Sequence, residues 1–301
     1  MKFDFYTADV FTKDIFNGAQ IAVIPDADGL NERHMQLIAR EFNLSETVFG
    51  FPGTGCDIRL RIFSPEEEVP FAGQALIASS YVLAKTGRLR LIGDRTSFKL
   101  GLNDDVIHIN IDRDNNGPSF VQFSTTVTPH IDEYVPERSE LADILSLQPG
   151  DMGCMKYRTL LSIANRNYLV VPVKSFECVR KAVFDLKAWG RSSAPAMMAQ
   201  RIFLFTNKGE SRQADFHARL LGPDIGINED LPIGAAIPAF TAYLCTHPHL
   251  SRGTHTYVAE RGLKSTRQSL LSVEMDNKGE ETITLRVGGP AVTVCSGTID
   301  I

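Results

Sequence analysis

One carboxylate, Glu46, lies within an otherwise largely apolar, strand-like segment at residues 44–51. The alternation of a strand places Glu46 on the same face as Val48 and on the opposite face from Phe49. If that face is buried, desolvation raises the pKa of the carboxyl group and suits it to accept or donate a proton near neutral pH. If the polar side of the strand faces water, no such shift follows, and the pattern alone leaves both alternatives open.

A predicted helix at residues 70–87 offers a place for an anionic group. Its sequence, PFAGQALIASSYVLAKTG, has apolar residues at helical spacing and a glycine where a helix ends. Because it carries no charge before Lys85, we expect this helix to be buried inside the fold. The first turn of a helix has unpaired N–H groups and the positive end of the dipole, and Gly73 would let an anion approach closely. The predicted ligand is therefore a carboxylate or phosphate.

The same pattern occurs again about half a chain later. Two acids, an aliphatic residue, a proline and a glycine precede an apolar helix at 67–83 and again at 229–244. In the second copy the glycine is Gly234, and Pro238 must lie in the first turn or kink the helix, because its ring clashes in a helix interior. The repeat indicates two similar lobes, each with a buried helix. The alternative is two unrelated core helices that are alike by chance.

The composition is that of a soluble globular protein with a sizeable core. The chain has 301 residues, of which 43% are hydrophobic and 22% charged. This length permits one large domain or two of ordinary size, and the repeat favours two. A net charge of −5 and a pI near 5.8 give no general attraction to nucleic acid or to an anionic membrane. The N-terminal residues alternate like a strand instead of forming a signal peptide, and no apolar run is long enough to span a bilayer.

Cysteine and histidine usage predicts a cytoplasmic protein without a metal site. The five cysteines are scattered and lack a C-x-x-C pair, which fits a reducing compartment. The seven histidines are dispersed, and the close pair His247 and His249 has no evident third ligand nearby.

The rest of the chain predicts mostly strands, with turns rich in Gly, Asn and Pro between them. Expected helices lie at 31–42, 70–87, 137–145, 175–189 and 234–244. Expected strands lie at 3–11, 19–25, 44–51, 59–63, 89–93, 96–100, 106–111, 119–124, 157–163, 167–172, 202–206, 215–221, 256–259, 270–275, 282–287 and 291–294. The polar stretch 124–136 is the expected boundary between an N-terminal lobe, 1–124, and a C-terminal lobe, 125–292. The last strand, 293–301, is a candidate to complete the N-terminal lobe.

Five motifs follow one another along nearly the whole chain. They are Asn43-Leu-Ser-Glu46; Arg61-Ile-Phe-Ser-Pro65 with Glu68-Val-Pro-Phe-Ala-Gly73; Ala218-Arg219 with Pro223; Gly226-Ile-Asn-Glu-Asp230; and Val287-Gly-Gly-Pro-Ala-Val292 with Gly297. In this order they resemble the PhzF-like, phenazine-biosynthesis family, which has the diaminopimelate epimerase-like fold.

The resemblance implies an α+β fold of two pseudo-symmetric lobes, each a curved, mostly antiparallel sheet wrapped round a central helix. It places the active site where the amino ends of the two helices meet, and it implies a homodimer. The family's best-known reaction isomerises a dihydro-hydroxyanthranilate by moving a proton, without a metal or an organic cofactor. By the same likeness Glu46 would be the general acid/base, and Asp230 would assist it or orient the substrate.

The sequence departs from the family at three places. The His that usually follows Phe-Ala-Gly is Gln74, and an amide can form hydrogen bonds but cannot carry a proton. The usual Thr-Gly-Ser-Ala at the second helix is Ile233-Gly-Ala-Ala236, which removes two hydroxyls, and the Gly-Asn-Pro of the first hairpin is Gly18-Ala-Gln20. Three interpretations follow: a different, less polar substrate; proton transfer through Glu46 alone; or a site that binds without catalysis.

Two-cysteine racemases share this fold, but they need a thiol at each helix start. Those places hold Ala72 and the step from Ile233 to Gly234. Cys245 falls at the far end of the second helix and Cys56 in a Gly-rich turn, so both are expected to be ordinary free thiols.

The sequence therefore favours a cofactor-free isomerase that acts on a small acidic substrate. Glu46 would take a proton from a carbon next to an unsaturated or carboxyl-bearing group and return it elsewhere on the molecule. The two helix starts, at Gly73-Gln74 and Gly234-Ala235, would bind the carboxylate, while Gln74 and Asp230 fix its orientation. The competing classes are a carboxylate-binding protein without turnover and a purely structural protein. The substrate itself is not fixed by the sequence.

Overall fold

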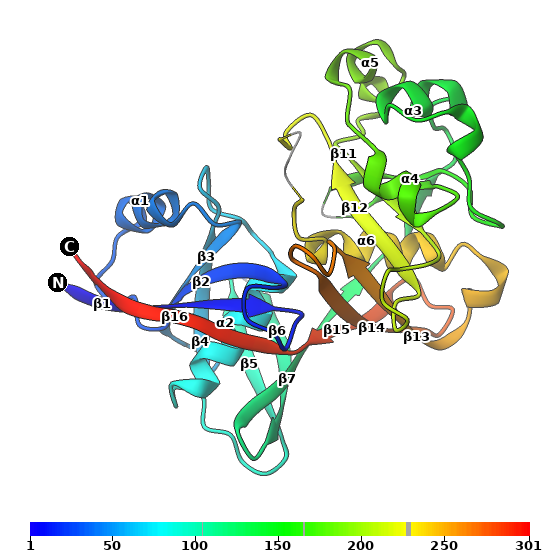
Figure 1. The fold of residues 1–301 in the computed structure, drawn as a ribbon. Coiled ribbons are helices and arrows are strands. Elements are labelled where there is room, and N and C mark those ends of the chain that lie inside the picture. The colour runs from blue at the N-terminus through cyan, green and yellow to red at the C-terminus, as the bar shows by residue number, and fades with distance from the viewer. Residues whose placement is uncertain (104, 165, 227–229) are drawn as a thin grey trace. The chain divides into compact units, whose positions relative to one another are not determined.

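The structure is a computed structural model, and it describes residues 1–103, 105–164, 166–226 and 230–301. The chain divides into two compact units (Figure 1). Unit 1 contains Met1–Thr125, Lys264–Leu271 and Arg286–Ile301, and unit 2 contains Thr126–Leu263 and Ser272–Leu285. Two stretches that the sequence assigned to the C-terminal lobe, 264–271 and 286–292, thus belong to unit 1.

Unit 1 is built on a mainly antiparallel sheet with the strand order β16-β1-β2-β3-β4-β5-β6-β7. Two neighbouring pairs, β2 with β3 and β4 with β5, are parallel. Because parallel neighbours need a long crossover connection, the chain inserts a helix in each of these two places. The strands are β1 (Lys2–Val10), β2 (Ala19–Ile24), β3 (Glu46–Pro52), β4 (Ile58–Phe63), β5 (Arg95–Leu102), β6 (Asp105–Asp114), β7 (Gly117–Val127) and β16 (Ala291–Asp300).

The second of these helices, α2 (Gly73–Lys85), is the central helix of unit 1. Every residue from Gly73 to Ala84 is buried, and the helix contacts β1, β2, β3, β6 and β16. The sheet wraps round it, which explains why the segment has no charged face and confirms the predicted buried helix. The helix ends at Thr86, and Gly87 follows with a φ of +77°, a backbone conformation that favours glycine.

The first crossover helix, α1 (Glu32–Phe42), lies on β3 and β4. The side chain of Asn31 caps its start by accepting a hydrogen bond from the His34 N–H, and Asn43 ends it with a φ of 50°. The predicted helix and its predicted stop at Asn43 are therefore confirmed. Its apolar face, with Met35 and Ile38, supports the strand that begins at Glu46.

Unit 2 is also built on a mixed sheet, and its strand order is β15-β14-β13-β12-β11-β10-β9-β8. The pairs β10 with β11 and β12 with β13 are parallel. Its strands are β8 (His130–Asp132), β9 (Leu160–Ile163), β10 (Asn167–Pro172), β11 (Arg201–Thr206), β12 (Phe216–Leu221), β13 (Gly253–Arg261), β14 (Ser269–Asn277) and β15 (Ile283–Gly289). Strands β14 and β15 each have residues in both units.

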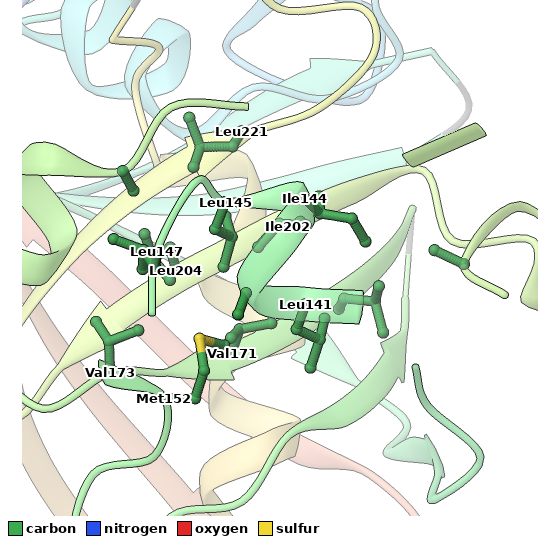
Figure 2. Packing of buried hydrophobic residues seen from close by; sticks show 14 of the residues in the cluster. Leu141, Ile144, Leu145, Leu147, Met152, Val171, Val173, Ile202, Leu204 and Leu221 are labelled. Atoms are coloured by element: carbon green, nitrogen blue, oxygen red, sulfur yellow. The ribbon is translucent and has the colours of Figure 1, made fainter. Parts of the chain in front are cut away.

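One hydrophobic cluster of unit 2 joins three short helices to the sheet. The helices are α3 (Arg138–Ile144), α4 (Phe176–Lys181) and α5 (Leu186–Arg191). Figure 2 shows Leu141, Ile144 and Leu145 lying over the strands that carry Val171 and Ile202. Burial of this apolar surface fixes the helices on one face of the sheet.

The buried helix of unit 2 is α6 (Ile237–Leu244), and all its residues are buried. Phe240 stacks on Phe203 with ring centroids 4.6 Å apart, and Tyr243 donates a hydrogen bond of 2.8 Å to the carbonyl of Arg158. Pro238 lies in the first turn of α6, as the sequence predicted, because its missing N–H needs no partner there.

Besides the start of α6, which is described with the site, three predicted elements differ from the structure. Residues 89–93 form no strand, because Leu89 donates its N–H to the Leu83 carbonyl and folds back on the end of α2. The strand predicted at 157–163 begins at Leu160. The helix predicted at 175–189 is two helices, because Ala182 is extended and Asp185 caps a new start.

The remaining predicted strands correspond to observed ones, and β16 continues to Asp300. Within the described residues, none of the helices combines the length and the apolar character needed for a membrane span. The architecture is α+β, as predicted.

Candidate active site

Glu46 is the first residue of β3, and only 9% of its surface is exposed. It lies in the sheet opposite Ile21 of the parallel neighbour β2, while the following residue, Thr47, pairs with Phe63 of β4. Of the two alternatives left open by the sequence, burial is the one observed. The Glu46 residue is therefore largely removed from water.

Both oxygens of Glu46 accept hydrogen bonds from side chains. Gln74 Nε2 donates to Oε1 over 2.7 Å, and Ser45 Oγ donates to Oε2 over 2.7 Å. Ser45 precedes Glu46 on the chain, whereas Gln74 is the second residue of α2. The structure thus brings together Glu46 and Gln74, two of the residues that the sequence singled out, and fixes the carboxylate from two directions.

The side-chain amide of Gln74 forms a hydrogen bond through its nitrogen but, within the described residues, none through its oxygen. Its side chain is 2% exposed, and its carbonyl oxygen, Oε1, has no hydrogen-bond partner in the described part of the chain. A carboxylate offers only acceptors, so the amide must present its N–H₂ group to Glu46 and its oxygen elsewhere.

The start of α2 lacks a side-chain cap among the described residues. Ala72 occupies the N-cap position in an extended conformation, and an alanine side chain cannot accept a hydrogen bond from the first turn. Gly73 and Gln74 follow, and the Gln74 side chain links this first turn to the carboxyl group of Glu46. This end of the helix favours negative charge.

The loop that leads into α2 is held by an ion pair. Arg61 of β4 donates from Nε to Glu68 Oε1 over 2.7 Å and from Nη2 to Glu68 Oε2 over 2.5 Å. Hydrogen bonding to Glu68, with a further contribution from Glu32, raises the pKa of Arg61 above its usual value. The Val69 N–H also donates to the Ile62 carbonyl, so the position of the helix start is set from β4.

In unit 2, Asp230 forms an ion pair that the sequence did not suggest. Its Oδ2 lies 3.1 Å from Nε of Arg261, at the end of β13, and the side chain of Arg261 is 8% exposed. The Asp230 side chain is 35% exposed, yet its Oδ1 is buried and has no hydrogen-bond partner within the described ranges. The contact is an ionic one, because Arg261 Nε approaches Asp230 Oδ2 without the geometry of a hydrogen bond.

Gly234 and Ala235 are not in the first turn of an α-helix, contrary to the prediction. They belong to a 3-10 turn, Gly234–Ala236 (η3), and α6 begins only at Ile237. Pro238 has no N–H for the carbonyl of Gly234, which accepts instead from the Ile237 N–H. Residues 227–229 of the motif before Asp230 lie outside the described residues.

Ala72 and Ile233, and not cysteines, stand at the two helix starts. Cys245 follows the last residue of α6, and burial raises its pKa to about 11. A thiol of this kind stays protonated at neutral pH and is a poor base. Within the described residues, no group of three or more His, Cys, Asp or Glu side chains is placed to hold a metal ion.

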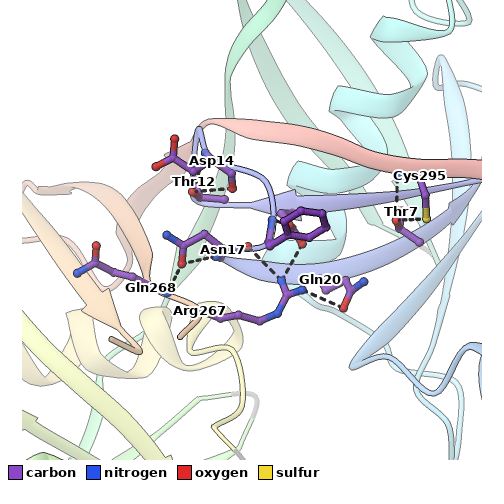
Figure 3. A network of polar contacts seen from close by, with 11 residues as sticks. Thr7, Thr12, Asp14, Asn17, Gln20, Arg267, Gln268 and Cys295 are labelled. Carbon is purple, nitrogen blue, oxygen red and sulfur yellow. Dashed lines mark hydrogen bonds and ion pairs between the residues drawn. The ribbon is translucent and has the colours of Figure 1, made fainter. Parts of the chain in front are cut away.

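The altered motif Gly18-Ala-Gln20 lies in a polar network of unit 1 (Figure 3). Arg267 donates to the buried Asp9 carboxylate over 2.8 Å and to Gln20 Oε1 over 3.3 Å. Gly18 has a φ of +64°, and a Cβ there would meet the Val10 carbonyl oxygen at 2.2 Å. This motif pins the β1–β2 hairpin to residues 264–271.

Similar proteins cover nearly the whole chain. An uncharacterized isomerase from Mesorhizobium japonicum is 30% identical over 301 residues, with 97% of each chain covered. The trans-2,3-dihydro-3-hydroxyanthranilate isomerase of Pseudomonas chlororaphis is 26% identical, again with 97% of each chain covered. These names support assignment of the chain to the isomerases.

Solved structures agree on the fold. A PhzF-family phenazine biosynthesis protein from Bacillus anthracis superposes with a TM-score of 0.86 at 21% identity, covering 100% of both chains. A probable proline racemase from Agrobacterium radiobacter has a TM-score of 0.66 at 12% identity, covering 99% of this chain and 93% of its own. The sequence model of the family described as "Phenazine biosynthesis-like protein" matches residues 8–297 of this chain. The chain therefore belongs to the PhzC-PhzF family of phenazine biosynthesis-like proteins.

Proposed function

We propose that this protein is a cofactor-independent isomerase that moves a proton within a small, carboxylate-bearing metabolite. The observation that carries the proposal is the carboxyl group of Glu46, which is 9% exposed and held through both oxygens next to the uncapped start of α2. Burial favours the neutral acid, whereas two donors favour the carboxylate. Opposed effects of this kind suit a group that must exist in both forms during one reaction.

In the proposed reaction the Glu46 carboxylate removes a proton from a carbon next to an unsaturated or carboxyl-bearing group. The electron pair of the broken C–H bond moves into the conjugated system, and the negative charge that develops is stabilised by N–H groups at the start of α2. The Glu46 carboxylic acid then returns the proton to a different carbon. The double bond has moved, nothing is oxidised or reduced, and Glu46 regains its starting form.

Gln74 has a defined place in this scheme. Its amide cannot exchange a proton at neutral pH, so it cannot act as a second acid or base. Through its 2.7 Å hydrogen bond to Oε1 it orients Glu46 instead. We therefore propose that Glu46 performs both proton transfers.

We propose that Asp230, Gly234 and Ala235 of unit 2 assist the same reaction. The ion pair with Arg261 supports an orienting role for Asp230, since it attracts one carboxylate oxygen towards a buried positive charge. The backbone N–H groups of the turn that contains Gly234 and Ala235 would bind substrate, although this start has lost the hydroxyls found in the family. A homodimer and a cytoplasmic location are likewise proposed from the family likeness.

The substrate class is proposed from the names of the relatives. Two of them are named trans-2,3-dihydro-3-hydroxyanthranilate isomerase, and that substrate is a cyclic unsaturated acid. We propose a small unsaturated acid for this chain too, with specificity changed by Gln74 and by Ile233.

The test compares two glutamine variants that differ in burial. Wild-type protein is incubated with trans-2,3-dihydro-3-hydroxyanthranilate and with related cyclohexadiene carboxylates, and isomerisation is followed by the ultraviolet absorbance of the shifted double bonds. Glu46→Gln should lower turnover of an accepted acid by about 10²- to 10⁴-fold. Glu41→Gln, on the exposed side of α1, should retain it. Turnover that survives in Glu46→Gln would refute the proposed role.

The second candidate is a carboxylate-binding protein without turnover. It is favoured by the loss of polar groups at Gln74 and at Ile233-Gly-Ala-Ala236. A ligand that binds only the folded protein raises its melting temperature. Acids that raise the melting temperature but are never isomerised, at any pH, would support this candidate against the isomerase.

A further inference from the structure

We propose that two copies of this chain associate through strand β16, so that the sheets of two copies of unit 1 become one continuous sheet across a two-fold axis. Strand β16 is the last strand of its sheet, and within the described residues its one partner strand is β1 (Figure 1). This inference goes beyond the proposed function, because it names the surface and the register of the homodimer. No step of the proposed reaction depends on it.

The backbone of β16 directs alternate residues towards β1 and away from it. The Ile301 N–H donates to the Met1 carbonyl over 2.8 Å, and the register with β1 stays regular from there to Ser296. In an antiparallel pair, alternate residues exchange both backbone hydrogen bonds with the neighbouring strand. The N–H and C=O groups of Ser296, Thr298 and Asp300 therefore point away from β1, along the outer edge.

This edge lacks the features that normally keep an edge strand from pairing with another chain. Native edges are short, or they carry lysine, proline or a bulge. Strand β16 has ten residues without proline, lysine or arginine, and its one charged residue is Asp300 at its end. The irregularity in its pairing with β1 lies beyond the outward-facing residues, between Thr7 and Ala8. We therefore expect a further strand to cover the edge.

One face of the sheet beside this edge is apolar and partly exposed. Phe5, Phe42 and Ile299 are partly buried side chains that pack on the same core cluster. The ring centroids of Phe5 and Phe42 lie 5.0 Å apart, and a Cβ at Gly297 would meet Phe5 Cε1 at 2.7 Å. The Phe5 ring therefore lies against Gly297, on the strand that forms the edge. An added strand would bury more of this apolar surface.

A second copy of β16 fits this edge, because an antiparallel pair across a two-fold axis presents the same groups from both sides. An axis at Thr298 pairs Ser296 of each copy with Asp300 of the other, so that the outward-facing backbone groups of both copies can exchange hydrogen bonds. It also places Ile299 of each copy opposite Gly297 of the other, where a large side chain meets a residue without a Cβ. An axis at Asp300 would instead bring two carboxylates face to face, which is unfavourable.

The first test measures the mass of the wild-type protein and of two Thr298 variants by analytical ultracentrifugation. Wild-type protein should be a dimer at micromolar concentration. Thr298→Pro removes an N–H at the centre of the proposed pairing that takes no part in the pairing with β1, so it should raise the Kd of the dimer by about 10- to 100-fold. Thr298→Val loses the hydroxyl and its 3.5 Å hydrogen bond to Asp4 but keeps the N–H, and it should remain dimeric.

The second test does not depend on whether the Thr298→Pro protein folds. With the exposed Cys295 replaced by serine, Thr298→Cys would place two thiols opposite each other, with Cα atoms about 5.5 Å apart, which a disulfide can span. Asp4→Cys is the matched control, since Asp4 lies opposite Thr298 on β1 and its two copies would be about 14 Å apart, or three strand spacings. Mild oxidation should link the Thr298→Cys protein into a covalent dimer and leave the Asp4→Cys protein unlinked.

A monomeric wild-type protein would overturn the inference, and so would a folded Thr298→Pro protein that is as dimeric as wild type. Failure of Thr298→Cys to cross-link, or equal cross-linking of Asp4→Cys, would show that the copies do not meet in this register. The proposed function fails on a different result, namely turnover that survives Glu46→Gln. The two claims can therefore be refuted separately.

Discussion

The side chains that hold Glu46 come from two sources with very different sequence separation. Ser45 is its neighbour in the chain, and Gln74 lies 28 residues away on α2. Strand alternation showed which face of the strand carries Glu46, but it could not show whether that face is buried. The answer depends on α2 filling the curve of the sheet, which is a non-local contact. The role of Glu46 stays a prediction.

Arg261 shows what a linear pattern misses. In the sequence it is one of several basic residues in a short segment, yet in the structure its side chain is 8% exposed and lies 3.1 Å from Asp230. No local signal marks this pairing, because 31 positions separate the two residues and the fold alone brings them together. Burial of an arginine is itself a signal, since arginine is seldom buried unless it is paired.

The first prediction concerns this ion pair. Asp230→Asn and Arg261→Gln should each lower kcat/KM by roughly 10-fold, because each removes the same charge interaction. Residues that act together are not additive, so the double variant should be little worse than either single one. The kinetics of an accepted acid measure this in all four proteins. Independent losses that multiply in the double variant would show that Arg261 does not act through Asp230.

A second prediction uses the pKa of Cys245. Burial raises this pKa to about 11, so the reactive thiolate is scarce at neutral pH and increases as the pH rises towards that value. In the folded protein, alkylation of Cys245 by iodoacetamide should therefore still accelerate above pH 9. In guanidinium-unfolded protein the rate should level off above the ordinary thiol pKa of about 8.5. Peptide mass spectrometry identifies the alkylated cysteine. If the alkylation rate of Cys245 in the folded protein levelled off near pH 8.5, its pKa would not be raised, and the argument against Cys245 as a catalytic thiol would fail.

At the scale of elements, the segment before α2 decides where the proposed site begins. The sequence predicted the buried helix from its apolar content and its glycine end, and both are confirmed. It could not show that Arg61 holds Glu68 through two hydrogen bonds, because that contact joins β4 to the loop 64–72. The uncapped first turn of α2 is positioned by this contact.

The third prediction tests this contact. Glu68→Gln should lower the free energy of unfolding by about 1 kcal/mol, a modest value because both side chains are partly exposed. It should also reduce activity, since the start of α2 loses part of its support. Urea unfolding and kinetics measure the two effects. The matched control is Glu67→Gln, whose side chain is exposed and which should change neither.

The second helix start differs from its prediction for a local reason. A glycine before an apolar run suggested that α6 begins at Gly234, but Pro238 cannot donate to the carbonyl of that residue. A 3-10 turn replaces the first helical turn as a result. The repeat in the sequence therefore identifies two buried helices correctly, while their amino ends differ in geometry.

At the scale of the whole molecule, the fold class and most elements could be predicted from the sequence. The order of the strands could not, because it depends on partners far apart in the chain. Strand β16, for example, pairs with β1 from the opposite terminus, with Phe3 opposite Ile299. For the same reason, residues 264–271 belong to unit 1 although their neighbours in the chain belong to unit 2.

Family membership and structure point to the same kind of chemistry, but the altered residues make its course specific to this chain. Under the proposed mechanism Glu46 both removes and returns the proton, because Gln74 stands where the family has a histidine. A proton held by a buried acid exchanges with solvent only in part before it is returned. We therefore expect that part of the product carries, at its new position, the same proton that was removed from the substrate.

The most direct measurement is the isotope content of the product formed in D₂O from an accepted, unlabelled acid. The proposed mechanism predicts that a measurable share of product molecules carries the substrate's own hydrogen at the new position, and that Glu46→Gln forms product at least 100-fold more slowly. Complete deuteration at that position from the first turnover, together with undiminished product formation in Glu46→Gln, would contradict it.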